Sequence, residues 1–364
     1  MKTETFLLFA LLRNALFQEP LKVDEWRNVD WNLLYALVKS HTLQTLVAEA
    51  VLSLPDDCCV PLGIRDELTR LMGRNMAEHM RLNADIAKVF HLLVGKGFHP
   101  VLMKGQGNAA FYPKTLLRKC GDVDIYVGET DYDAACRFLL ENLDNAVLKG
   151  ESEKHRVIFW GKTDLEIHRI AEAPIPPQNA LVYADLVNKY FSQPDYVVIA
   201  GQKIAVPPAQ FNAVYVFYHL YRHFKLRGIS LRQFCDVAVL LHQFAGRIDL
   251  RQLKEDLVEF RLMEGWQLFG SVFARYLGLP QSEFPFYREI SKKKSERLAR
   301  LVVDDGDFAK NVGRYYKGTS FWGQKFYSFC GLNSRYWRIA RISPSMALTT
   351  YPYIVKCGIK AAFR

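Results

Sequence analysis

The sequence predicts an α+β fold in which a small mixed β-sheet is flanked by helical lobes on its N- and C-terminal sides. Apolar residues recur every three or four positions over residues 31–52 and 68–93, which is the period of amphipathic helices. From residue 97 to about 170 the pattern changes to short apolar or alternating runs bounded by glycines, which is typical of strands. Helical periodicity returns in the next third of the chain.

A chain of 364 residues is long enough for two or three domains. Hydrophobic residues make up 50% and charged residues 24%, which excludes a disordered or collagen-like chain. We predict four segments: a helical N-terminal region over 1–95, an α/β core over 96–200, a C-terminal helical lobe over 201–285, and a basic, aromatic tail over 286–364.

The N-terminus superficially resembles a signal peptide, but Arg13 ends its apolar run after the seven residues 6–12. We therefore expect a buried first helix, and no run approaches the roughly 18 residues needed to span a bilayer. The seven cysteines are scattered and form no CxxC pair, which disfavours a structural zinc site and predicts a reduced, cytoplasmic compartment.

The elements of the core alternate between strands and helices, and from residue 180 on we expect helices only. Polar and apolar residues alternate in the central strand, which indicates one solvated face. The predicted elements are a buried strand over 98–103, a short helix over 105–112, a strand over 122–127, a helix over 131–142, and strands over 155–160 and 163–168 joined at Gly161-Lys162.

Carboxylates are the first candidates for chemistry in this core. Asp122 and Asp124 are two residues apart on a predicted strand, so their side chains share one face. Two neighbouring carboxylates repel each other, and a divalent cation removes that repulsion. Mg²⁺ takes oxygen ligands and leaves positions for phosphate oxygens. Glu166, on the same face of a neighbouring strand, is the third carboxylate that such a site needs.

A glycine turn precedes the two aspartates. Gly105 follows the first strand and opens a helix, where backbone N–H groups bind phosphate. Lys104 and Arg118 supply positive charge for a triphosphate. The same turn also fits the G-x-G-x-x-A pattern of dinucleotide-binding proteins. That alternative is disfavoured because Asp122 and Asp124 begin their strand, and because a second βαβ half is missing.

These residues resemble the nucleotidyltransferase superfamily that includes DNA polymerase beta. The likeness is greatest to a bacterial group of uncharacterised nucleotidyltransferases with Lys-Gly in the turn. It is specific over about residues 98–170 and looser over 205–245. Aminoglycoside nucleotidyltransferases share an Arg-x-x-Gly-Asp-h-Asp phrase, met here by Arg118, Gly121, Asp122 and Asp124. Two features depart from the pattern: the second turn position is Gln106, and the spacer to the first aspartate is long.

The resemblance implies a palm-like nucleotidyltransferase core that transfers a nucleoside monophosphate from a nucleoside triphosphate, with ATP as first candidate, to an acceptor hydroxyl, with release of pyrophosphate. Two Mg²⁺ ions are implied at Asp122, Asp124 and Glu166, and Glu166 or a neighbouring carboxylate helps to deprotonate the acceptor. The nucleotide-binding set is Lys104, Gly105, Gln106 and Arg118. The acceptor and the base stay open, as does the alternative of a non-catalytic, nucleotide-binding regulatory module.

Several polar residues outside this set have two interpretations. His219 and His223 are four apart on a predicted helix, and we favour packed or surface histidines over a metal pair. For Arg232 and Asp236 we favour an ion pair within one helix over a role at the nucleotide. The sequence does not decide whether His168 supports Glu166 or is a plain polar residue.

The positive charge of the chain lies in its tail. Residues 286–364 hold 16 basic and 5 acidic residues, so this segment accounts for the whole excess of 48 Lys+Arg over 38 Asp+Glu. Residues 308–364 contain thirteen aromatic residues and no acidic ones, which suits an anionic partner. We slightly favour a lid packed on the catalytic body. The functional alternative is peripheral attachment to the inner face of a membrane, with residues 325–342 as an interfacial helix, ahead of nucleic acid.

Overall fold

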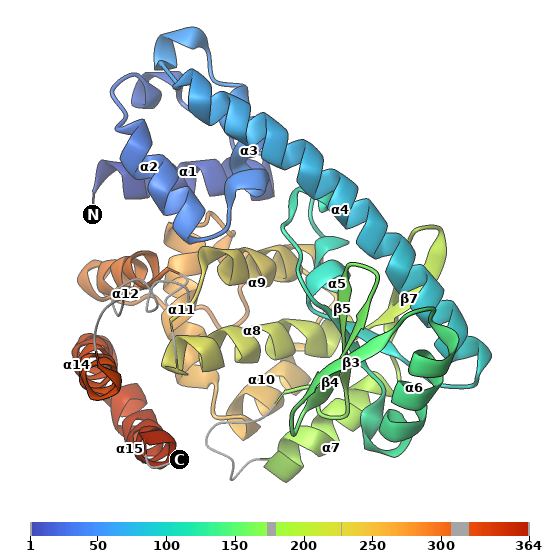
Figure 1. Ribbon diagram of the computed structural model, residues 1–364. Helices are drawn as coiled ribbons and strands as arrows, with labels where there is room; N and C mark the ends of the chain where they lie inside the picture. Colours follow the sequence, from blue (N-terminus) through green and yellow to red (C-terminus); the bar gives the residue numbers. More distant parts are fainter. Residues whose placement is uncertain (1, 173–179, 227, 307–319, 363–364) are drawn as a thin grey trace.

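The computed structural model describes residues 2–172, 180–226, 228–306 and 320–362 (Figure 1). It confirms the α+β class, with a five-stranded mixed sheet in the order β1-β2-β5-β4-β3 and a separate two-stranded sheet of β6 and β7. No helix within the described residues is long and apolar enough to cross a membrane.

Four helices precede the sheet: α1 (Thr3–Phe17), α2 (Trp31–Ser40), α3 (Gln44–Leu52) and α4 (Leu62–Gly95). The apolar run at the N-terminus is part of α1, where Leu8, Leu11 and Leu12 have no exposed surface. The prediction of a buried first helix is therefore confirmed. Figure 1 shows α4 running from this N-terminal group along the molecule to the sheet, so one helix joins the two parts.

The central sheet contains the predicted elements in the predicted order, together with one further strand at Val147–Glu151 that the sequence pattern did not predict. Its strands are β1 (Val101–Met103), β2 (Val123–Tyr126), β3 (Val147–Glu151), β4 (His155–Trp160) and β5 (Thr163–His168), with α5 (Gly105–Ala109) after β1 and α6 (Gly128–Asn142) after β2. The bounds of β4 and β5 are those expected from the sequence. Because β1 and β2 pair antiparallel, the dinucleotide-binding βαβ unit, which needs parallel strands, is excluded.

One face of this sheet is apolar and the other is polar. Val123, Ile125, Leu165 and Ile167 have no exposed surface and belong to the core cluster that α4 and α6 complete. The residues that alternate with these four along the strands therefore point to the other face of the sheet, toward the C-terminal helices. This alternation decides which side chains of β2 and β5 reach the functional site.

The expectation of helices only after residue 180 is wrong. Helix α7 (Ala180–Phe191) is followed by a hairpin of β6 (Asp195–Ile199) and β7 (Gln202–Val206). The two turn residues, Ala200 and Gly201, both have positive φ, at 48° and 78°, as a tight two-residue hairpin requires. Ile204 and Val206 are fully buried in the core of the large sheet, so tertiary packing stabilises this hairpin.

The C-terminal lobe consists of α8 (Ala209–Leu226), α9 (Leu231–Gln243), α10 (Leu250–Glu259) and α11 (Met263–Arg275). Helix α8 is buried over most of its length, and Figure 1 shows it among the other helices of the lobe. Ser230 caps α9 and Asp249 caps α10 by accepting hydrogen bonds from first-turn N–H groups, which fixes where both helices begin.

Close packing of α8 against α11 yields a stability prediction. A Cβ at Gly265 would lie 2.6 Å from Cε2 of Tyr221, a buried ring with little room to move. We expect Gly265→Ala to lower the free energy of unfolding by about 1–3 kcal/mol, as overpacking does. The matched control is Gly73→Ala in α4, where nothing lies within 4 Å and the higher helix propensity of alanine should stabilise the protein. Urea unfolding of both variants measures the difference, and equal stability would contradict the prediction.

The described part of the tail is helical, with α12 (Lys292–Asp305), α14 (Phe321–Ala340) and α15 (Pro344–Ala362). Tyr336, Ile339 and Ile342 are buried in the large core cluster, as expected of a packed segment. Arg335 departs from the expectation that basic groups stay in water, because its guanidinium pairs with Asp305 at 2.9 Å and both side chains are only 4% exposed.

Arg335 is therefore not available to an anionic surface. Trp337 and Phe329, by contrast, are exposed on α14. The expected aromatic and basic segment at residues 308–319 and the side chain of Trp322 lie outside the described residues.

Candidate active site

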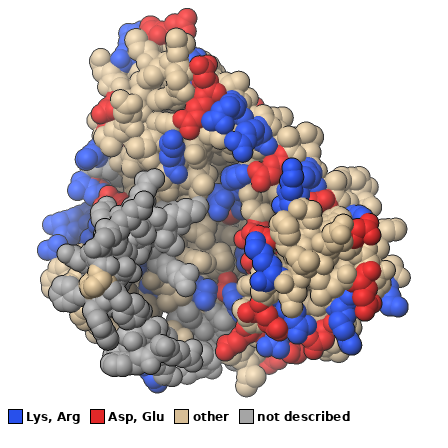
Figure 2. Space-filling view, viewed as in Figure 1, with Lys and Arg blue, Asp and Glu red and all other residues tan. Residues whose placement is uncertain are grey.

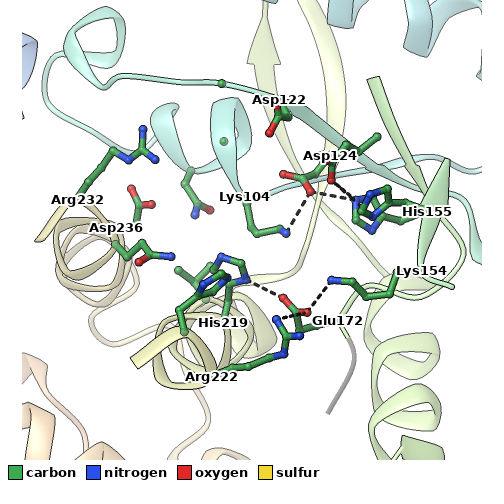
Figure 3. A pocket seen from close by; sticks show the side chains of 18 of the residues that line it. Lys104, Asp122, Asp124, Lys154, His155, Glu172, His219, Arg222, Arg232 and Asp236 are labelled. Atoms are coloured by element: carbon green, nitrogen blue, oxygen red, sulfur yellow. Dashed lines mark hydrogen bonds and ion pairs between the residues drawn. The ribbon is translucent and has the colours of Figure 1, made fainter. Parts of the chain in front are cut away.

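A cavity of about 680 Å³ lies between the polar face of the sheet and helices α8 and α9 (Figure 3). Figure 2 shows basic and acidic side chains close together around the hollow in the middle of the molecular surface in this view. Both kinds of charge also line the cavity itself. Its charged and histidine lining is Lys104, Arg118, Lys119, Asp122, Asp124, Lys154, His155, Glu166, His168, Glu172, His219, Arg222, His223, Arg232 and Asp236.

Strand register brings the acidic residues together. Strands β2 and β5 are parallel, with Asp124 opposite Glu166, so these carboxylates share the polar face. Asp122 precedes β2 by one residue and lines the same cavity. Burial raises the pKa of Asp122, and the negative charges of Glu166 and Asp124 raise it further. All three predicted carboxylates thus lie close together in the cavity, where their negative charges repel one another.

Lys104 and His168 are the groups in contact with the innermost carboxylate. The Nζ of Lys104 lies 3.1 Å from Oδ1 of Asp124, and the Nε2 of His168 lies 3.0 Å from the same oxygen. Burial alone would raise the pKa of Asp124, but Lys104 and His168 outweigh it and hold the pKa of that carboxyl below its ordinary value. His168, left open by the sequence, is therefore beside two of the carboxylates, since it also lies 3.3 Å from Glu166.

The turn between β1 and α5 aims Lys104 at Asp124. Lys104 has φ 49° and ψ −143°, a conformation that costs energy for any residue except glycine and that recurs at functional sites. Gly105 follows with a positive φ of 34°, and both residues line the cavity. Gln106 does not line it. Its side chain is buried, and neither amide atom has a hydrogen-bond partner among the described residues.

Arg118 lies on the opposite wall and is held by α9. Its Nε and Nη2 donate to the two oxygens of Asp236 at 2.7 Å each, and the Tyr112 hydroxyl donates to Oδ1 of Asp236 at 2.6 Å. The expected Arg232–Asp236 pair within the helix is therefore wrong: Arg232 donates to the carbonyl of Lys119 instead. A carboxylate in a bidentate pair with a buried arginine is a stronger partner than one on a helix surface.

Sequence reasoning missed a group of residues around Glu172, which has no exposed surface. Lys154 lies 2.9 Å from this carboxylate, Nδ1 of His219 lies 2.7 Å away, and Arg222 lies 3.3 Å away. Burial acts to raise the pKa of Glu172, but His219 and the lysines hold it well below its usual range. Figure 3 shows this group on the cavity wall below Lys104.

The favoured interpretation of His219 as a packed or surface residue missed this role. Its ring and that of His223, 4.5 Å apart, line the cavity on α8. The spacing of residues 219, 222 and 223 places them on one helix face, and this pattern could have indicated from the sequence that they line the same site. Nothing in the sequence marks Glu172, which lies in the irregular segment after β5.

The residues of this site fit a divalent cation. Asp122, Asp124 and Glu166 supply oxygen ligands in the cavity, where burial and the two neighbouring carboxylates raise the pKa of Asp122. Hard cations such as Mg²⁺ prefer such oxygens. Lys154 and Arg222 form a basic wall below Lys104 in Figure 3, so the cavity offers basic side chains as well as carboxylates.

The fold and the cavity define an α+β protein with a carboxylate-bearing sheet face enclosed by a helical lobe. The chain belongs to the family described as uncharacterised nucleotidyltransferase, whose model matches residues 27–278. The match begins after α1 and covers α2 to α4, the sheet and the C-terminal lobe up to the end of α11, and it supports a general nucleotidyl-transfer function. No curated protein and no solved structure is significantly similar to the chain.

Proposed function

We propose that this protein transfers a nucleoside monophosphate from a nucleoside triphosphate, with ATP as first candidate, to an acceptor hydroxyl. The observation that carries the proposal is the convergence of Asp122, Asp124 and Glu166 on a cavity that also holds Lys104, Lys154 and Arg222. The negative charge of a triphosphate must be offset by cations. This cavity offers carboxylates that can hold metal ions and basic side chains that can contact phosphate oxygens.

In this proposal Asp122, Asp124 and Glu166 hold two Mg²⁺ ions, which would stabilise the charge of the triphosphate and of the leaving pyrophosphate. Lys104, whose Nζ lies 3.1 Å from Asp124, exchanges this carboxylate for a phosphate oxygen when nucleotide enters. Lys154 and Arg222, ordered by buried Glu172, bind the outer phosphates. The backbone at Gly105 borders the nucleotide, and Arg118 contacts it while held by its ion pair with Asp236.

The reaction that follows is an in-line displacement. The acceptor oxygen attacks the α-phosphorus, the bond to the bridging oxygen breaks, and pyrophosphate leaves with that electron pair. The proton of the hydroxyl passes to Glu166 or a neighbouring carboxylate in the cavity. Helices α8 and α9 line the cavity, so this part of the helical lobe is the one that would choose the acceptor.

Labelled nucleotide tests the proposal directly. The full-length chain, Mg²⁺ and cell extract are incubated with ATP labelled at the α-phosphate or at the γ-phosphate, and the other nucleotides are tested in parallel. We expect the α label to enter an acceptor and the γ label to appear as pyrophosphate, with chelation of Mg²⁺ abolishing both. Magnesium-dependent nucleotide binding with no pyrophosphate from any extract would favour a non-catalytic module. Absence of binding would exclude both functions.

A charge change on the basic wall gives a second expected result. Lys154→Met removes one cation but leaves Arg222 and His219 on Glu172, so the buried carboxylate keeps partners. We expect the Kd for ATP to rise about tenfold, the loss of one charge-assisted hydrogen bond. Lys149→Met is the control, because this lysine pairs with Asp164 on the exposed part of the same sheet. Calorimetry measures both, and an equal change in the two variants would contradict a phosphate contact at Lys154.

A further inference from the structure

His168 has the surroundings of a metal ligand. Its Nδ1 lies 3.3 Å from the carbonyl oxygen of Ile170, which can only accept, so this nitrogen carries the proton. A metal ion that displaces the proton from Nε2 would bind the lone pair of this nitrogen. The side chain is 1% exposed, and Nε2 points between Asp124 and Glu166, at 3.0 and 3.3 Å, without the geometry of a hydrogen bond. A backbone carbonyl on the second nitrogen is how proteins orient histidines that bind metals.

His155 repeats the arrangement from the neighbouring strand. It lies opposite His168 in the antiparallel pair of β4 and β5, and the two ring centroids are 4.7 Å apart. Its buried Nδ1 lies 3.7 Å from Oε2 of Glu166 and has no hydrogen-bond partner among the described residues. One ligand atom each from His155, Glu166 and His168 lie within 4.8 Å of one another.

These separations suit a six-coordinate ion. Ligand atoms about 2.1 Å from a metal and at right angles lie about 3 Å from each other. The contacts of Glu166 and Asp124 with His168 have that length, and His155 is slightly farther. In the metal-free protein Lys104 contacts Asp124 at 3.1 Å, and a cation bound beside this carboxylate would take over that neutralisation. Carboxylates alone suit Mg²⁺, whereas imidazole ligands favour first-row transition metals.

We propose that His155 and His168 are metal ligands, and that with Asp124 and Glu166 they form a nitrogen-containing site that selects a transition-metal ion such as Mn²⁺ over Mg²⁺. The inference rests on the proposed function, since it concerns one of the two cations at the carboxylates, but it changes the identity of that ion. Asp122, on the more exposed side, remains a ligand of the other cation, whose ligands are all oxygen atoms.

Mn²⁺ is the probe for the test, because its electron paramagnetic resonance signal reports both binding and nitrogen ligands. We expect the full-length chain to bind Mn²⁺ at least tenfold more tightly than Mg²⁺, measured by competition, and to show ¹⁴N coupling. His168→Gln should weaken Mn²⁺ binding about 10–100-fold and reduce the nitrogen coupling. Mg²⁺ binding should change less than about threefold, since this ion gains little from imidazole.

His155→Gln is the second variant and should have the same effects in smaller measure. His242→Gln is the matched control: this imidazole also contacts a carboxylate, Glu283, at 2.6 Å, but outside the cavity. It should leave binding and coupling unchanged. Circular dichroism identifies any variant that does not fold, and a binding loss in such a variant is set aside in favour of the other.

Two results would overturn the inference in different ways. Mn²⁺ binding without nitrogen coupling, unchanged in both histidine variants, would define an all-oxygen site and leave the proposed nucleotidyl transfer intact. If neither Mn²⁺ nor Mg²⁺ binds the wild type, with or without ATP, the metal chemistry of the proposed function fails as well.

Discussion

Asp124→Asn is expected to lower pyrophosphate release from ATP by at least about 1,000-fold, which corresponds to about 4 kcal/mol of transition-state stabilisation. Asp124 is the innermost of the three cavity carboxylates, and its oxygen contacts both Lys104 and His168. Asparagine keeps the shape but removes the charge on which a divalent cation and the position of Lys104 depend. The effect should appear in kcat, because the lost interactions act on the charge that develops during transfer.

Asp164→Asn is the matched control for this prediction. Asp164 lies on β5, two residues before Glu166, and pairs with Lys149 at the surface. The substitution therefore removes one nearby negative charge without changing a residue of the cavity. We expect less than a threefold change in this variant. Pyrophosphate release is measured with saturating Mg²⁺ and cell extract as acceptor source. Similar rates in wild type and Asp124→Asn would exclude this aspartate from the chemistry.

The second large effect concerns stability. Arg118 and Asp236 are 6% and 7% exposed, and their bidentate pair joins the loop before β2 to α9. Arg118→Met leaves the Asp236 carboxylate buried with the Tyr112 hydroxyl as its one side-chain hydrogen-bond donor among the described residues. Removing one member of such a buried pair costs about 3–5 kcal/mol, so we expect the free energy of unfolding to fall by that amount.

The surface pair of Arg251 and Glu255, whose side chains are 90% and 56% exposed, is the control for Arg118. Arg251→Ala should cost less than about 1 kcal/mol. Chemical denaturation measures both variants. A variant Arg118→Met that unfolds like the wild type but binds ATP weakly would contradict the structural role and favour direct phosphate contact.

The sequence placed the carboxylates well because the rules that locate them are local. Alternation along 122–127 and 163–168 determines which side chains share a face, and strands β2 and β5 have that alternation. The glycine turn was also found from its neighbours, although the helix after it ends at Ala109, earlier than expected. The hairpin at residues 195–206 was missed because its strands gain their stability from burial of Ile204 and Val206 in a core that the segment itself does not contain.

What the sequence by itself determined is the α+β class, the order of the core elements apart from β3, and the three carboxylates, since period-two alternation and glycine turns act over a few residues. Only the tertiary structure decided which partners those residues meet. Arg118 pairs with Asp236 across 118 positions of chain, Glu172 contacts His219 of α8, and strand register places His155 opposite His168. Long-range pairs depend on how whole helices and strands pack. A buried charge is stable only beside a partner that offsets its desolvation. No local pattern carries that information.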